Sequence, residues 1–339
     1  MDTIILQQPG RFEMATRERP ASPPPGHALV KIHRVGICGT DWHAWRGKQP
    51  FFTYPRVLGH ELGVEVVEVN EPSSALKPGD RCAVEPYLNC GTCIACRSGK
   101  GNCCVNLQVL GVHRDGGMQE LLLVPANKMH PSKKLSFEQL ALVETLGIGC
   151  HAAARGQVRR GEKVLVIGAG PIGLSVLPFV KADGGELIVA DVSEARLDFC
   201  SNWLGDVKTV DARQDLLRQL QALNNGDLPT LVIDATGNPQ SMATSFDFVA
   251  HGGRLVFVGL FQGDVTFNDP NFHRREITLL ASRNALPADF SRIIGLVEDG
   301  TIDTQPWITH RIGHRDLCGI IDEWAKPQSN VLKAMVSFE

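Results

Sequence analysis

Residues 163–173 read KVLVIGAGPIG, and this stretch decides the fold of the middle of the chain. Its first five residues are mostly apolar and β-branched, as in a buried strand, and a helical pattern begins at Pro171. Between them lies a G-x-G-x-x-G turn. In such a turn the first glycine allows the tight bend, the second lets a pyrophosphate approach the backbone, and the third packs helix against strand. Because the start of the helix offers free N–H groups and a positive dipole end, the stretch predicts a dinucleotide site.

An acidic residue follows at the distance that such a site needs. Asp191 ends the next predicted strand, residues 186–190, and lies eighteen residues beyond Gly173. Its carboxylate can accept hydrogen bonds from ribose hydroxyls and would repel the 2′-phosphate of NADP, which favours NAD. Arg196 lies close by and could weaken that preference. A plain turn with a helix-capping acid explains these features singly but not their order. The predicted cofactor residues are Gly168, Gly170, Pro171, Ile172, Gly173, Asp191, Arg196, Thr236, Gly259 and Ser282.

Outward from this motif, strands alternate with helical stretches, which indicates βαβ units and a parallel sheet. The predicted strands of this block are residues 163–167, 186–190, 207–210, 230–233, 254–258 and 277–281. Residues 28–145 instead hold short strands broken by glycine and proline, and the chain ends in a predicted strand at 332–338. We therefore predict an α/β protein in which a nucleotide-binding domain, residues 146–281, is inserted into a β-rich domain, residues 1–145 and 282–339.

Length and composition fit a two-domain globular protein. The 339 residues are 43% hydrophobic and 21% charged, and the net charge is −3 without a long run of one sign, so neither nucleic acid nor an anionic membrane is an expected partner. The longest apolar run, residues 164–180, is interrupted by glycine and proline and belongs to the dinucleotide motif rather than to a membrane span. The N-terminal residues lack signal-peptide features, so we expect a cytoplasmic protein.

Cysteines crowd into residues 90–104. A C-x2-C-x2-C-x7-C pattern is formed by Cys90, Cys93, Cys96 and Cys104. Thiolates so spaced can converge on one zinc ion in a closed structural site. Cys103 could replace Cys104, although we favour Cys104. An iron–sulfur cluster is the rival, but the bacterial ferredoxin pattern has a shorter last gap followed by proline, and here Val105 follows. Free thiols are disfavoured, because four in one short loop have little packing purpose.

Three further candidate ligands lie far apart in the sequence. Cys38 lies in GICGTDWH (36–43), His60 in GHE (59–61), and Glu144 just before the nucleotide-binding domain. A catalytic zinc needs three protein ligands and one open position, and a thiolate with a carboxylate would neutralise its charge. Taken singly, each has a plainer explanation: a core cysteine, a hydrogen-bonded loop histidine and a surface acid.

Together these motifs resemble the medium-chain dehydrogenase superfamily in its polyol and sorbitol dehydrogenase-like branch. The resemblance runs through essentially the whole chain and rests on GICGTD, PRVLGHE (55–61), the four-cysteine lobe, the acid at 144, GAGPIG and Asp191. It implies a GroES-like catalytic domain, an inserted Rossmann domain, NAD, and one catalytic and one structural zinc ion. It also implies that Cys38, His60 and Glu144 hold the catalytic zinc, with Glu61 as a neighbouring or alternate ligand. Glutamate at the third position is typical of the polyol branch, whereas alcohol dehydrogenases have cysteine there. Relatives commonly continue with proline, and this chain has Thr145 instead.

The resemblance also implies roles around the zinc, where a Lewis acid would activate a secondary hydroxyl and hydride would pass to the nicotinamide. Thr40 and His43 match positions that relay protons through the cofactor ribose to solvent, and a histidine suits the outer end of such a relay. The plainer alternative for His43 is a surface histidine. Arg283 matches an arginine that faces the substrate, and its guanidinium could grip a carboxylate. A surface ion pair is its plainer alternative.

Four stretches narrow the resemblance to bacterial dehydrogenases that oxidise hexonates at C5, such as L-galactonate and L-gulonate 5-dehydrogenases. They are HAWRGKQPFFTYPRVLGHE, GVHRDGG, FVGLFQGD and ASRNALPADF. This implies a sugar-acid substrate, with pocket candidates Trp45, Phe51, Phe52, His113 and Arg283. A neutral polyol dehydrogenase and a threonine 3-dehydrogenase are alternatives. A silent NAD-binding or regulatory protein on the same fold is another, but such proteins lose the zinc ligands. Relatives are homodimers or homotetramers, often joined through the last strand of the nucleotide domain, here residues 277–281.

Overall fold

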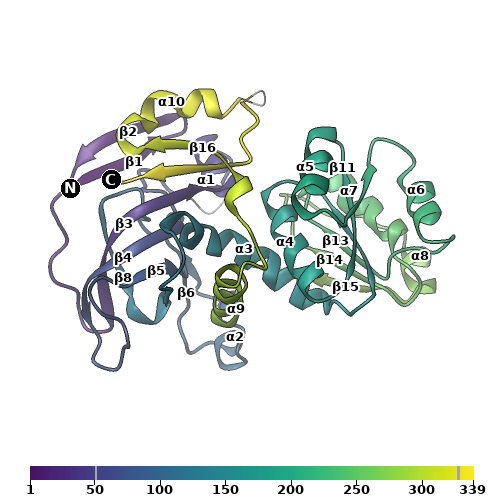
Figure 1. Ribbon diagram of the computed structural model, residues 1–339, viewed down its shortest axis with the longest axis horizontal. Coiled ribbons are helices and arrows are strands. Elements are labelled where there is room, and N and C mark those ends of the chain that lie inside the picture. The colour runs from purple at the N-terminus through teal and green to yellow at the C-terminus, as the bar shows by residue number, and fades with distance from the viewer. Residues whose placement is uncertain (50–51, 327–328) are drawn as a thin grey trace. The chain divides into compact units, whose positions relative to one another are not determined.

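The computed structural model describes residues 1–49, 52–326 and 329–339 (Figure 1). The chain divides into two compact units, Met1–Thr145 with Leu286–Glu339, and Leu146–Ala285. The second boundary thus follows Ala285, whereas the predicted boundary followed residue 281. Sheet pairing continues just past residue 281, because the Ser282 N–H donates to the Phe257 carbonyl at 2.9 Å. None of the described helices is long and apolar enough to cross a membrane.

The second unit is built on a six-stranded sheet in which every pairing is parallel. Its strands are β10 (Lys163–Ile167), β11 (Glu186–Asp191), β12 (Lys208–Asp211), β13 (Leu231–Asp234), β14 (Arg254–Phe257) and β15 (Thr278–Ala281). The connecting helices are α4 (Pro171–Ala182), α5 (Glu194–Leu204), α6 (Leu216–Leu223), α7 (Pro239–Thr244) and α8 (Asp269–Arg274). The order β12-β11-β10-β13-β14-β15 changes direction between β10 and β13. This confirms the predicted doubly wound fold, which binds dinucleotides at the carboxyl ends of the strands beside that switch point.

Burial explains why the central strands are continuous apolar runs. In β10 every residue after Lys163 is buried, and β13 is buried throughout. Strands of a parallel sheet are covered on both faces, so their sequences do not alternate between apolar and polar residues. These continuous apolar runs are also the pattern from which the strands were predicted.

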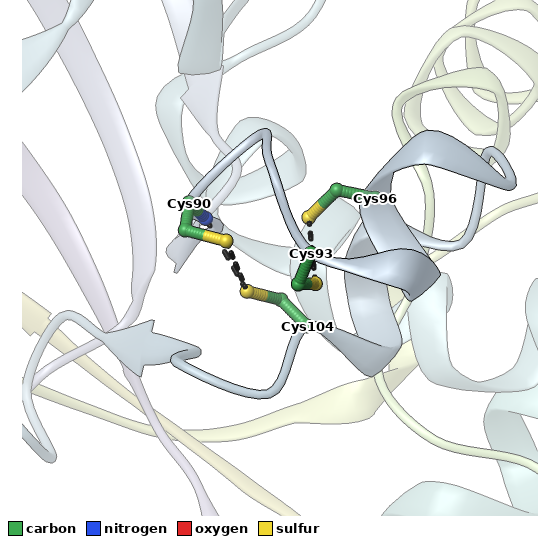
Figure 2. A group of neighbouring side chains, drawn as sticks. All are labelled: Cys90, Cys93, Cys96 and Cys104. Carbon is green, nitrogen blue, oxygen red and sulfur yellow. Dashed lines mark hydrogen bonds between the residues drawn. The ribbon is translucent and has the colours of Figure 1, made fainter.

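The first unit is mainly antiparallel. One seven-stranded sheet runs β16-β17-β3-β4-β5-β9, with β8 also paired to β3, and β1–β2 and β6–β7 form two-stranded sheets. The strands are β1 (Asp2–Gln8), β2 (Arg11–Thr16), β3 (His27–Ile37), β4 (Glu61–Asn70), β5 (Arg81–Val84), β6 (Tyr87–Leu88), β7 (Gln108–Val109), β8 (Leu121–Pro125), β9 (Met129–Pro131), β16 (Ile308–Gly313) and β17 (Lys333–Ser337). The helices are α1 (Gly39–Trp45), α2 (Ile94–Arg97), α3 (Phe137–Gly156), α9 (Pro287–Glu298) and α10 (Leu317–Trp324). Of the four cysteines of the predicted structural site, Cys93 caps α2 and Cys96 lies within it, while Cys90 and Cys104 lie before and after it (Figure 2).

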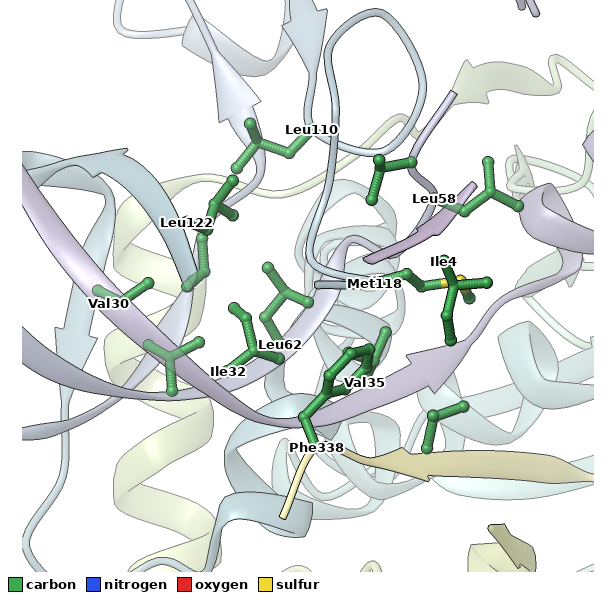
Figure 3. Packing of buried hydrophobic residues seen from close by; sticks show 14 of the residues in the cluster. Ile4, Val30, Ile32, Val35, Leu58, Leu62, Leu110, Met118, Leu122 and Phe338 are labelled. Carbon is green, nitrogen blue, oxygen red and sulfur yellow. The ribbon is translucent and has the colours of Figure 1, made fainter. Parts of the chain in front are cut away.

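The C-terminal segment completes the sheet begun by the N-terminal one. Strand β17 pairs antiparallel with β3, so that Val336 lies opposite Val35. Side chains from both ends of the chain meet in one core, where Phe338 lies beside Val35 (Figure 3). This arrangement places β17 next to the strand that leads into Cys38.

Helix α3 contains the boundary between the units, because it continues from Phe137 to Gly156 while the first unit ends at Thr145. The predicted change of pattern near residue 146 therefore falls inside a helix rather than in a loop. Glu144 lies in this helix and is buried.

Candidate metal and cofactor sites

Cys38 and His60 come together because their strands pair. Strand β3 leads into Cys38, which caps the N-terminus of α1, and Glu61 opens β4. The register places Gly36 of β3 opposite Glu61. The ligand atoms of Cys38, His60 and Glu61 consequently lie within 4.8 Å of one another, as a metal site requires.

The third predicted ligand, Glu144, is not part of this group of three. It lies close enough for its charge to raise the pKa of His60, after larger effects of burial, Asp41 and Cys38. One oxygen of its carboxylate, Oε1, accepts a short hydrogen bond from the Tyr87 hydroxyl. Burial comes first among the causes that raise the pKa of Glu144. The assignment of Glu144 as a ligand remains a prediction, and Glu61 lies nearer the other two candidates.

Glu61 is held by a buried cation from the C-terminal strand. The Lys333 ammonium lies 2.6 and 2.8 Å from the two carboxylate oxygens and 3.3 Å from Thr145 Oγ1. Burial is the largest influence on the pKa of Glu61 and would raise it, but the charges of Lys333 and His60 and the hydrogen bonds of Lys333 and Thr145 together lower it. Burial alone would lower the pKa of Lys333, and Glu61 raises it. Both partners therefore stay charged, which is how a buried ion pair compensates the cost of desolvation.

His60 is oriented by a second carboxylate. Asp41 Oδ2 accepts the Cys38 N–H at 2.9 Å, and its Oδ1 faces His60 Nδ1 at 3.8 Å. Both Nδ1 and Oδ1 are buried, and neither has a hydrogen-bond partner among the described residues. A carboxylate behind an imidazole is the usual outer partner of a metal-binding histidine. A thiolate, an imidazole and a carboxylate are also the donor types that zinc prefers, so the residues present fit a zinc ion.

The four predicted structural ligands converge as expected from their spacing. Their ligand atoms lie within 4.8 Å of one another, and the sulfur atoms approach in two pairs, Cys93–Cys96 at 3.5 Å and Cys104–Cys90 at 3.4 Å (Figure 2). Cys103 is exposed and lies outside the group, which favours Cys104 over it. Hydrogen bonds from Thr92 come first among the causes that lower the pKa of Cys90 to about 5, whereas the pKa of its partner Cys104 is raised to about 11, so the two sulfurs share one proton unequally.

The dinucleotide motif has the predicted conformation. Gly168 adopts φ = 96°, and a Cβ on Gly173 would lie 1.7 Å from the Gly168 carbonyl oxygen, so only glycine fits there. Asp191 accepts the Ala169 N–H at 2.6 Å and the Ser193 N–H at 2.8 Å, which fixes its carboxylate beside the turn. Arg196 Nη1 lies 3.9 Å from Asp191 Oδ2.

The remaining cofactor candidates follow β13, β14 and β15. Thr236 Oγ1 donates to Asp234 at 2.6 Å, which shapes the loop after β13. A Cβ on Gly259 would lie 2.1 Å from Gly237 N, so the loops after β13 and β14 touch. Ser282 Oγ is buried without a partner in the part of the chain that the structure describes.

The other predicted site residues are dispersed. Thr40 and His43 lie on α1, and burial comes first among the causes that lower the pKa of His43, followed by Arg46 and Lys48. Arg283 belongs to the second unit, so its role toward the metal stays a prediction. His113 Nδ1 accepts the Val109 N–H at 3.1 Å and so supports a turn. Of the aromatic pocket candidates, Trp45 and Phe52 pack against the core of the first unit, and Phe51 lies outside the described residues.

Comparison with known proteins identifies the class. Residues 24–134 match the alcohol dehydrogenase GroES-like domain, and residues 171–299 match the zinc-binding dehydrogenase family. The chain belongs to the zinc-type medium-chain dehydrogenases, which are oxidoreductases that act on CH–OH groups.

Its relatives include sugar-acid and polyol enzymes. The chain is 42% identical to L-galactonate-5-dehydrogenase of Escherichia coli K12, over all of this chain and 99% of that protein. It is 31% identical to L-arabinitol 4-dehydrogenase of Aspergillus niger, over 92% of this chain and 85% of that protein. A solved structure of the alcohol dehydrogenase RspB from E. coli CFT073, complexed with NADH, matches with a TM-score of 0.92, 30% identity and coverage of 100% and 99% of the two chains. The match to the zinc-binding dehydrogenase family supports zinc as a cofactor, and the NADH complex of this relative supports NAD.

Sequence reasoning missed three residues that contact the predicted ligands: Asp41, Tyr87 and Lys333. Asp41 had a local signal, because it lies three residues after Cys38 at the start of a helix, where a side chain can reach back to the capping residue. Tyr87 and Lys333 reach the site only through tertiary contacts with partners distant in the sequence. No local pattern marks them.

The structural site makes a direct prediction about Cys104. Cys104→Ser should weaken zinc binding at this lobe by more than about 100-fold, since even the outer partners of metal ligands are worth about 10–100-fold. Cys103→Ser is the matched control and should keep the wild-type zinc content. Zinc per subunit after dialysis against a weak chelator measures both. Equal zinc loss in the two variants would contradict the assignment.

The expected preference for NAD over NADP leads to a prediction about Asp191. Asp191→Asn should raise the ratio of kcat/KM for NADP to that for NAD by at least about tenfold, because repulsion between like charges at such a contact costs several kcal/mol. Asp211→Asn is the control, since Asp211 lies opposite Asp191 at the end of β12. An unchanged ratio in the Asp191 variant would show that this carboxylate does not select the cofactor.

Proposed function

We propose that the chain oxidises a secondary alcohol with NAD at a catalytic zinc ion held by Cys38, His60 and Glu144. The observation that carries the proposal is the buried group around His60. Its Nδ1 faces Asp41 without a hydrogen bond, its ligand atom lies within 4.8 Å of those of Cys38 and Glu61, and the charge of Glu144 acts on it as well. The buried Nδ1 of His60 and Oδ1 of Asp41, which have no hydrogen bond among the described residues, are costly, and a metal ion bound by His60 would compensate that cost.

The chain's own residues then divide the work. Bound zinc supplies a Lewis acid that lowers the pKa of the substrate hydroxyl, and NAD supplies the hydride acceptor. Asp41 places a carboxylate oxygen 3.8 Å from Nδ1 of the His60 imidazole, and Lys333 compensates the charge of Glu61. Thr40, half-buried, and His43, exposed, lie on α1 as the inner and outer members of a proton relay to solvent.

We propose a hexonate, oxidised at its C5 hydroxyl, as the substrate. The support is the 42% identity to an L-galactonate-5-dehydrogenase over the full length. In this proposal Arg283 binds the substrate carboxylate, since a guanidinium recognises a carboxylate through two parallel hydrogen bonds. A neutral polyol is the second candidate, because an L-arabinitol 4-dehydrogenase is 31% identical.

The test is NADH formation with L-galactonate, L-gulonate, L-arabinitol, sorbitol, simple alcohols and L-threonine. Turnover of a hexonate with NAD, with a KM raised at least tenfold by Arg283→Gln, would support the sugar-acid proposal. Turnover restricted to neutral polyols would keep the chemistry and refute the role of Arg283. If no compound is oxidised, the proposal fails.

We also propose that the protein is a homo-oligomer, a dimer or a tetramer, joined through β15. This strand is the edge of the sheet, and Thr278 and Leu279 on it are exposed. An open edge strand with an apolar side chain is a template for pairing with a second copy. Light scattering should give a multiple of the 36.9 kDa chain mass, and Leu279→Lys should lower it. A monomeric wild type would refute the proposal. The cytoplasmic location stays a prediction.

A further inference from the structure

Tyr87 contacts Glu144, the predicted third zinc ligand. It lies in β6, a two-residue strand paired with β7, and only 3% of its surface is exposed. Its hydroxyl donates to Oε1 of Glu144, whose side chain is also buried. A buried hydrogen bond to a carboxylate is among the stronger ones in proteins, because the acceptor is charged.

The ring of Tyr87 is fixed by its packing. It meets Phe290 of α9 edge to face, with centroids 6.5 Å apart at 75°. Phe290 in turn stacks on His130 at 4.7 Å, and His130 lies 3.3 Å from Glu85. Phe290 and His130 therefore restrict the Tyr87 ring on the side that faces α9.

The two carboxylates near Cys38 and His60 therefore differ in what they can offer a metal. Both oxygens of Glu61 are taken by Lys333. Among the described residues, Glu144 has a hydrogen bond on Oε1 alone, which leaves Oε2 for another partner. With Oε1 engaged by Tyr87, Glu144 would bind a metal through Oε2 alone.

We infer that Tyr87 is a positioning residue that limits Glu144 to one metal-binding oxygen and so preserves the open position where the substrate hydroxyl binds. The inference rests on the proposed function, because it needs a metal at Cys38, His60 and Glu144. Without the hydroxyl, Oε1 would have no hydrogen-bond partner among the described residues, and Glu144 could offer both oxygens to a bound metal.

Tyr87→Phe removes the hydroxyl and keeps the ring against Phe290. The chain has one other tyrosine, Tyr54, whose hydroxyl donates to the Ala44 carbonyl, so Tyr54→Phe is a matched control. The probe is cobalt(II), whose visible absorption is intense in four-coordinate sites and weak in sites of higher coordination. The four-cysteine site also binds cobalt. The spectrum of the His60→Ala protein, in which only that site is expected to be filled, is therefore subtracted from the other spectra, which leaves the absorption of the catalytic site.

We expect the isolated band of Tyr87→Phe to lose most of its intensity, and kcat to fall about 10–100-fold, the usual effect of an outer partner of a metal ligand. Tyr54→Phe should keep the wild-type band. A band and a kcat in Tyr87→Phe equal to those of the wild type would overturn the inference while leaving the proposed function intact. If His60→Ala leaves the wild-type spectrum unchanged, no metal binds at this site, and the proposed function and the inference both fail. A Tyr87→Phe protein that does not fold, judged by circular dichroism, would also overturn it, since the hydroxyl would then be needed for stability.

Discussion

Replacing His60 with alanine is expected to remove the catalytic zinc ion while leaving the structural one, and to lower kcat/KM by about three orders of magnitude. Loss of a Lewis acid costs several kcal/mol of transition-state stabilisation, and each 1.36 kcal/mol is a factor of about ten. The fold should persist, because the structural site lies on a separate loop and its four cysteines have no part in holding His60. Zinc analysis and initial rates with NAD measure both effects.

The control for this variant is His251→Ala, since His251 is exposed in the second unit. It should keep the wild-type zinc content and rate. A His60→Ala protein that retains both zinc ions and full activity would show that the group around Cys38 is not the metal site.

The second large effect is expected from Lys333→Met, which leaves the Glu61 carboxylate buried without its cation. Breaking one side of a buried ion pair costs about 3–5 kcal/mol, because the remaining charge is uncompensated. The free energy of unfolding, measured in urea, should fall by that amount. Lys134→Met is the control, because Lys134 is 70% exposed and lies 4.0 Å from Glu298, and exposed pairs are worth about 0–1 kcal/mol.

The double variant Lys333→Met with Glu61→Gln separates charge from packing. Removing both charges should recover most of the lost stability, since no ion is then left unpaired. If the double variant is as unstable as Lys333→Met, the aliphatic stem of the lysine matters rather than its charge. A stability of Lys333→Met within about 1 kcal/mol of the wild type would contradict the account of this pair.

The parts of the molecule that could be predicted from sequence are those with a local cause. Strand β10 could be predicted because a buried parallel strand is a continuous apolar run. The glycines after it could be predicted because the turn, and the approach of Gly173 to the Gly168 carbonyl, exclude a side chain. The four-cysteine group could be predicted because its ligands lie within fifteen consecutive residues, so their spacing in the sequence limits how far apart the sulfur atoms can be.

The residues that could not be predicted depend on pairing between distant segments. Lys333 reaches Glu61 because β17 pairs with β3, which in turn pairs with β4. Tyr87 reaches Glu144 because a short strand lies against α3. Sheet pairing likewise continues one residue beyond the apolar run that marks β15, since the Ser282 N–H donates to the Phe257 carbonyl.

The central claim is that this chain is a zinc-dependent, NAD-linked alcohol dehydrogenase, and metal removal tests it most directly. The protein is stripped with a chelator, divided, and assayed for NADH formation with L-galactonate and the other substrates before and after zinc is restored. The account predicts that the stripped protein is inactive and that zinc restores turnover in the wild type but not in His60→Ala. Full activity of the wild type after its zinc has been removed, as confirmed by metal analysis, would contradict it.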